Sequence, residues 1–192
     1  QVCVLDHPEV PCTTSDADGV FVLMADLSGP VALDVTHADY FSGLFHLEVD
    51  ETGGGFPGAP LIALAFAGLF DGAGAPEDPT KAHLASGLMF MGGGPAAGAT
   101  VTITPASGIG PVYFAGGGPD PSATGITDGP FAGINLEPGE VTVTYSHPSA
   151  TCARRAGASW PAADPTDLSS TRVLLRAGRI SVFGTAFCEP TP

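Results

Sequence analysis

Five histidines and many carboxylates are the residues of this chain that could do catalytic or metal chemistry. The histidines are His7, His37, His46, His83 and His147, and none has the HxxE or HExxH spacing of a zinc hydrolase. No GxSxG nucleophile motif is present, and the GGG runs at residues 53–55, 92–94 and 116–118 lack the lysine of a phosphate-binding loop. The sequence therefore predicts no catalytic residue and a protein that is not an enzyme.

Two aspartates of the sequence DADG, Asp16 and Asp18, are the candidates for a metal site. Closely spaced carboxylates supply the oxygen ligands that calcium prefers, but no Glu follows at the twelfth position of an EF-hand loop. The alternative is structural, because an Asp side chain in a turn accepts hydrogen bonds from nearby backbone amides. We therefore expect no cofactor, with calcium at these two residues as the alternative.

Aromatic residues provide the candidate binding positions. The only tryptophan, Trp160, could form a stacking platform for a sugar together with Tyr113, Phe114 and Tyr145. Residues 112–115 and the loop around Trp160 would then grip a glycan or a cell-surface protein. The alternative is that these aromatic side chains fill the core or pin a loop.

Four cysteines, Cys3, Cys12, Cys152 and Cys188, are even in number and lack CxxC spacing. Three pairings are available, and we favour Cys3 with Cys12 and Cys152 with Cys188 because each stays inside one half of the chain. Four buried thiols are the alternative. A disulfide framework indicates an oxidising compartment, so we expect a secreted or cell-surface protein.

The net charge of −14 is unevenly distributed. Residues 1–80 hold 13 Asp and Glu and no Lys or Arg, whereas all five arginines lie in residues 151–192. Nucleic-acid binding is not expected, because phosphate contacts need a larger basic surface. The acidity either keeps the surface solvated or attracts the basic tail of another copy. No apolar run approaches the length of a membrane span, and no leader precedes Gln1, so we expect a soluble, processed or truncated chain.

An internal repeat indicates how the chain is organised. Residues 13–37 and 124–147 share an Asp-Gly turn, a Phe, an apolar stretch, a Gly and an alternating strand that ends before a His. His37 and His147 hold equivalent positions, where a half-exposed residue at a strand end is the ordinary interpretation. Two copies of one β unit are the predicted architecture.

Strands are expected throughout both copies, at residues 2–5, 20–24, 31–36, 45–49, 83–91, 100–104, 112–115, 141–145, 172–175 and 179–187. Residues 53–60 read as a loop, and residues 61–70 as a buried strand or a short helix. Residues 71–80, DGAGAPEDPT, are the best linker. The predicted domains are therefore residues 1–70 and 81–192.

The repeated stretches resemble the carboxypeptidase regulatory-like domain, a small transthyretin-like β-sandwich of secreted, often bacterial, proteins. The second unit matches as PAAGATV at residues 95–101 and TDGPF at residues 127–131, and the first as TSDADGVF at residues 14–21 and ADYF at residues 38–41. The resemblance implies two tandem transthyretin-like or Ig-like antiparallel sandwiches and no catalytic residue. The residues expected to define the turns are Asp16, Asp18, Gly19, Phe21, Asp128, Gly129 and Phe131.

The first unit lacks a counterpart of the strand that precedes PAAGATV in the second unit. A sandwich without that strand exposes an unpaired sheet edge. A truncated chain, a strand from elsewhere in this chain and a strand from a neighbouring molecule are the three explanations.

We therefore expect a structural protein whose copies join head to tail into an extracellular homopolymer, with a donated strand completing the first domain. The residues expected to form the assembly contacts are Val2, Val4, Ile180, Val182, Phe183, Phe187, Arg172, Arg176 and Arg179. An adhesive or accessory module that binds glycan or protein is the alternative.

Overall fold

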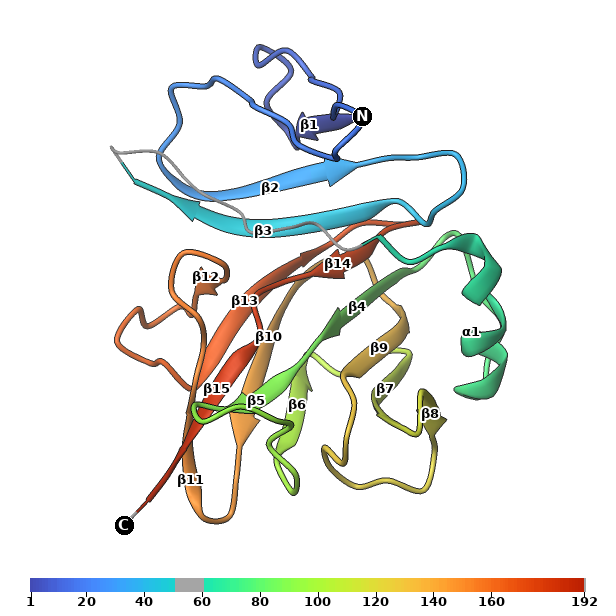
Figure 1. Cartoon of the computed structure of the whole chain (residues 1–192), viewed down its shortest axis with the longest axis vertical. Coiled ribbons are helices and arrows are strands. Elements are labelled where there is room, and N and C mark those ends of the chain that lie inside the picture. The colour runs from blue at the N-terminus through green and yellow to red at the C-terminus, as the bar shows by residue number, and fades with distance from the viewer. Residues whose placement is uncertain (51–60, 192) are drawn as a thin grey trace.

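The computed structural model describes residues 1–50 and 61–191, and this part of the chain is nearly all β (Figure 1). Strands hold 44% of the residues and helices 4%, which confirms the predicted all-β class. No helix among the described residues is long and apolar enough to cross a membrane. The loop predicted at residues 53–60 lies outside the described residues.

The largest sheet has eight strands and draws on both halves of the chain (Figure 1). In spatial order the strands are β1 (Val2–Val4), β2 (Gly29–Val35), β3 (Gly43–Val49), β14 (Ile180–Val182), β4 (Ala82–Ser86), β9 (Phe131–Leu136), β7 (Ile109–Ala115) and β8 (Gly118–Asp120). Strand β14 is parallel to β3 and to β4, and the other neighbours are antiparallel. A strand from late in the chain thus joins the N-terminal hairpin to the rest.

Two smaller sheets complete the second half. One has the order β12 (Trp160–Pro161), β13 (Ser170–Leu175), β10 (Gly139–Ser146) and β6 (Thr100–Thr104), and the other has β11 (Ala150–Ala153), β15 (Ala186–Pro190) and β5 (Leu88–Phe90). The main core lies between the four-stranded sheet and β4 and β9, where Leu84 and Phe131 join Val101, Val143 and Val173 in one buried cluster. Burial of apolar side chains from two facing sheets is the driving force for a sandwich.

The β2–β3 hairpin is buried on both faces. Val31, Leu33, Phe45 and Leu47 pack with β1 on one face, while His46 on the other face is fully buried. Five consecutive residues of β3 are therefore buried, whereas β6 alternates cleanly between buried and exposed positions. The first pattern is that of a strand covered on both faces, and the second is that of a strand with one face exposed to solvent.

Two predicted strands are each divided in the structure. Residues 83–91 form β4 and β5, and residues 179–187 form β14 and β15. β14 runs parallel to β4, and β15 runs parallel to β5, so the two divided segments pass together from one sheet to the other. At the crossing the Ser86 hydroxyl donates to the Phe183 carbonyl at 3.0 Å, and the Ala186 amide donates to the Gly87 carbonyl at 3.0 Å.

Residues 20–24 do not form the predicted strand, so that prediction is wrong. The side chains of this segment do alternate between exposed and half-buried positions, but a strand also needs a neighbouring backbone to pair with. Among the described residues this segment has no such neighbour.

A short helix forms where the sequence left a strand or a helix open. A 3-10 turn (Leu64–Phe66) leads into α1 (Gly68–Gly72), and Phe70 packs against Phe41 and Ile180. The predicted linker that follows is anchored, because Asn135 accepts a hydrogen bond from the Asp78 amide at 3.0 Å and donates one to the Pro76 carbonyl at 2.9 Å.

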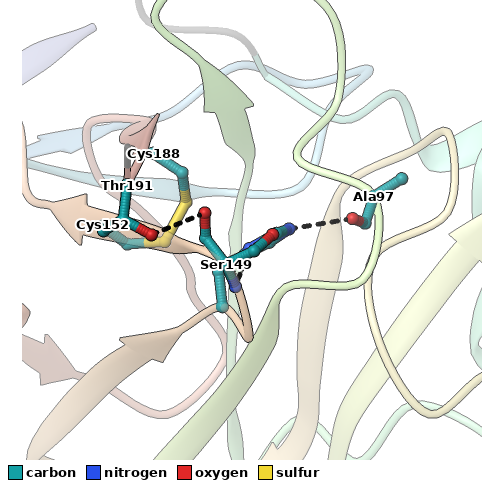
Figure 2. The surroundings of a disulfide bond; sticks show 6 residues. Ala97, Ser149, Cys152, Cys188 and Thr191 are labelled. Carbon is teal, nitrogen blue, oxygen red and sulfur yellow. Dashed lines mark hydrogen bonds between the residues drawn. A yellow bond between two sulfur atoms is a disulfide. The ribbon is translucent and has the colours of Figure 1, made fainter.

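Both disulfides have the pairing that the sequence favoured. Cys3 bonds Cys12 near the N-terminus, and Cys152 bonds Cys188 across β11 and β15. Figure 2 shows the second bond beside the C-terminal end, where the Thr191 hydroxyl donates to the Ser149 carbonyl at 3.1 Å. The last strand is therefore fixed to its neighbour.

Candidate binding surface

The DADG turn positions an extended apolar segment, residues 20–24. Asp16 Oδ1 accepts hydrogen bonds from the amides of Asp18 at 3.0 Å and Val20 at 2.9 Å, and Gly19 has a φ of 80°. Only glycine adopts that dihedral freely. The carboxylate thus closes the turn, as the structural interpretation of the sequence predicted.

Side chains of this segment alternate between the core and the solvent. Phe21 and Leu23 are half-buried against the apolar cluster of β1, β2 and β3. Val20, Val22 and Met24 point outward, with exposed fractions of 59%, 70% and 84%. In the described part of the chain, the backbone of residues 21–28 makes no hydrogen bond. The segment has the form of a strand without a partner.

The ends of this segment are acidic. Asp16 and Asp18 precede it, Asp26 follows it, and all three are exposed. The complete sequence has no Lys or Arg before residue 81. An apolar stripe whose backbone groups at residues 21–24 are free of hydrogen bonds to other described residues, and whose ends are acidic, can accept an extended polypeptide through main-chain hydrogen bonds, apolar contact and charge.

The repeated histidines have one structural role in common. His37 Nδ1 accepts from the Asp39 amide at 3.2 Å, and His147 Nδ1 accepts from the Ser149 amide at 3.0 Å. In each case the ring closes a turn just after the middle strand of its unit. This shared geometry supports the internal repeat and the strand-end interpretation of both residues.

Two other histidines are buried in the main sheet. His46 Nε2 accepts from the Leu174 amide at 2.9 Å, and its Nδ1 lies 3.4 Å from the Val182 carbonyl. Burial lowers the pKa of His46 to about 4, although these backbone contacts oppose the shift. Burial also lowers the pKa of His83 to about 4, although the negative charge of Asp78 opposes this shift. Both rings are therefore neutral at pH 7.

The aromatic positions expected to bind a ligand are not a platform in the structure. Trp160 is 8% exposed, and its indole N–H donates to the Val31 and Leu47 carbonyls at 3.0 and 3.2 Å. Tyr113 is 4% exposed and its hydroxyl accepts from the Val101 amide at 2.9 Å, while Phe114 is half-buried. Trp160 and Tyr113 fill the core because the hairpin and the sandwich close over them. Core packing, the alternative to ligand binding, therefore accounts for Trp160 and Tyr113.

The arginines expected to contact another copy are paired within the chain. Arg179 donates to both carboxylate oxygens of Asp34 at 2.8 and 3.1 Å. The other two pairs are Arg176 with Asp6 at 2.7 Å and Arg172 with Glu140 at 3.4 Å. The acidic N-terminal part and the arginines of the C-terminal part therefore do meet, but they meet within one molecule, through the Arg176–Asp6 and Arg179–Asp34 pairs.

The apolar residues assigned to assembly are also engaged. Val2, Val4, Ile180 and Phe183 are at most 6% exposed, and Val182 and Phe187 are half-buried in paired strands. Thr13 exchanges two 2.8 Å backbone hydrogen bonds with Val2, so the outer side of β1 is partly occupied. On the far side of the hairpin, β14 pairs with β3.

The second unit's turn uses its acid differently from the first. Asp128 accepts from the Gly116 amide at 3.2 Å, and Gly129 lies so close to Phe114 that an added Cβ would be 2.8 Å from its carbonyl oxygen. Phe131 after this turn is fully buried, whereas Phe21 is half-buried. The sequence predicted both turns but not the exposed stripe of residues 20–24. The repeat could have indicated it, because these residues correspond to the start of β9 and the first unit lacks the strand that precedes PAAGATV in the second.

Among the described residues, no group of three or more His, Cys, Asp or Glu side chains is placed to hold a metal ion. No protein-family model, curated protein or solved structure matches the chain. The resemblance to the carboxypeptidase regulatory-like domain stays a prediction. The exposed stripe of residues 20–24 is the feature from which a function can be argued.

Proposed function

We propose that this protein is a non-enzymatic extracellular module that binds another polypeptide through its N-terminal unit. The observation that carries the proposal is the outwardly apolar segment of residues 20–24, whose backbone from residue 21 onward makes no hydrogen bond in the described part of the chain. Large apolar side chains in a row on a soluble surface commonly mark an interaction site. The two disulfides support an oxidising compartment such as the cell exterior.

Head-to-tail polymerisation has weaker support than polypeptide binding. The strand expected to be donated, residues 180–187, is paired within its own molecule as β14 and β15. Cys188 is also bonded to Cys152, so release of this tail would require loss of sheet pairing and of a disulfide. A different polypeptide with an unpaired strand binds without the loss of sheet pairing or of a disulfide.

Selection from a display library of random linear peptides tests the proposal. We expect enriched peptides to bind wild-type protein and to lose at least tenfold in affinity for the Val22→Asp variant, because a carboxylate would then lie in the apolar stripe. Met91→Asp is the matched control, since Met91 is 67% exposed in a turn of the other unit. Failure to enrich any peptide, or equal binding to Val22→Asp, would contradict the proposal.

A further inference from the structure

The two units contain the same three-stranded sheet. In the first unit β2 lies between β1 and β3, and in the second β10 lies between β6 and β13, with antiparallel pairing throughout. Each middle strand follows a segment that leaves an Asp-Gly turn. That segment is residues 20–24 in the first unit and β9 in the second. The repeat therefore makes residues 20–24 the structural counterpart of β9.

In the second unit, the position beside β9 is filled. Strand β4 pairs with it antiparallel, with Ala85 opposite Ala132 and Ser86 opposite Phe131. In the first unit, the same position beside residues 20–24 holds no strand from the described residues. The difference between Phe131, which is fully buried, and Phe21, which is half-buried, fits this difference in coverage.

The β4–β9 pair also shows which charge suits such a position. Lys81 immediately precedes β4 and donates to Glu137 Oε1, just after β9, at 2.6 Å. Aligning the two Asp-Gly-x-Phe motifs places Asp26 one residue before the counterpart of Glu137. A basic residue at the N-terminal end of an antiparallel strand would therefore meet Asp26.

The same charges argue against a second copy as the occupant. If residues 20–24 of two molecules paired antiparallel about Val22, Asp18 of each would lie opposite Asp26 of the other. Like charges directly opposite one another destabilise a strand pair. Residues 1–80 offer no Lys or Arg to offset this repulsion.

We infer that residues 20–24 accept an antiparallel strand from a different polypeptide, with apolar side chains on both faces and Lys or Arg at its N-terminal end. This inference rests on the proposed polypeptide binding and adds the orientation and the charge of the ligand. The bound strand takes the position that β4 has beside β9. Its basic end lies against Asp26, its inner face covers Phe21 and Leu23, and apolar side chains on its outer face lie beside Val22.

The probe for this inference is a fluorescently labelled peptide with the sequence of residues 81–90, KAHLASGLMF, titrated into the full chain. We expect saturable binding that is weakened at least tenfold by Val22→Asp and severalfold by Asp26→Lys. A peptide with Glu in place of its Lys should bind severalfold more weakly than the original. The Met91→Asp variant should bind the peptide as the wild type does.

Backbone methylation separates strand addition from general apolar adhesion. Alternate amides of a strand point to opposite sides, so N-methylation of one alternate set removes the donors that face residues 20–24, and methylation of the other set does not. We expect one pattern to abolish binding and the other to retain it. Equal effects of the two patterns, or equal binding to Val22→Asp, would overturn the inference.

Two further outcomes would assign a different occupant. Wild-type dimerisation in light scattering that is lost in Val22→Asp would make a second copy the occupant and overturn the inference. Binding to neutral lipid vesicles that depends on Val22 would likewise replace the polypeptide with a membrane surface. Library peptides that need Val22 but show no preference for a basic end would overturn the inference and leave the proposed function intact.

Discussion

At the scale of single residues, the most informative side chains are the buried polar groups between the N-terminal hairpin and the rest. His46 connects β3 to backbone groups of Leu174 and Val182, and Trp160 donates to carbonyls of β2 and β3. These contacts satisfy polar atoms that would otherwise be buried without a partner. They make the hairpin dependent on the C-terminal half of the chain.

The free energy of unfolding should fall as the pH falls from about 6.5 to about 4. In this window the unfolded histidines bind protons, while burial holds the pKa values of His46 and His83 at about 4 in the folded state. Because the unfolded state then binds more protons, each of these histidines costs up to about 1.4 kcal/mol per pH unit. Urea denaturation at pH 7, 6 and 5 measures this slope.

The His46→Gln variant should have a shallower slope than the wild type over the same pH range. Asp164→Asn is the control, because an aspartate ordinarily titrates below this window and hydrogen bonds with Thr166 lower the pKa of Asp164 further. An unchanged slope in His46→Gln would show that His46 does not titrate as expected.

At the scale of elements, the extended segments show how pairing depends on tertiary context. β9 and residues 20–24 follow similar turns, but only β9 has strands on both sides. Likewise β4 and β5 are one apolar stretch in the sequence, and Gly87 divides them because the chain passes between sheets there. Local pattern predicts an extended backbone, and neighbours decide whether it is a strand.

Removal of the Cys152–Cys188 bond should destabilise the protein more than removal of the Cys3–Cys12 bond. The sequence separations are 36 and 9 residues, and a longer loop loses more entropy on closure. The chain-entropy relation gives about 4 and about 3 kcal/mol, respectively. Paired Cys→Ala variants of each bond, compared by urea denaturation, measure the two costs. The reverse order would indicate that strain or residual structure dominates.

At the scale of the whole molecule, one eight-stranded sheet crosses the division predicted between residues 1–70 and 81–192. β14 lies between β3 and β4, and the Arg179–Asp34 and Arg176–Asp6 pairs lie between the N-terminal and C-terminal parts. The junction is the strand pair of β3 with β14, so the sheet continues without a break from the N-terminal hairpin into the rest of the chain (Figure 1). A continuous sheet and ion pairs across the division favour unfolding as one unit.

Thermal or urea unfolding should therefore show one transition. Trp160 fluorescence reports on the contact with the β2–β3 hairpin, and far-ultraviolet circular dichroism reports on all strands. We expect the two midpoints to coincide in the wild type and to fall together in Arg179→Met, which loses its ion pair with Asp34. Two separate transitions would instead support independent domains.

The sequence by itself determined the all-β class and the two Asp-Gly turns, and it favoured the observed disulfide pairing among three, while it left a strand or a helix open at residues 61–70. Those features depend on residues close together in the chain or on simple periodicity, and the turn of Asp16 and Gly19 is one example. Only the tertiary structure decided that β14 joins the two halves, that Trp160 is buried and that Val20, Val22 and Met24 are exposed. The physical reason is that pairing and burial depend on neighbours that are distant in the sequence, which no local pattern specifies.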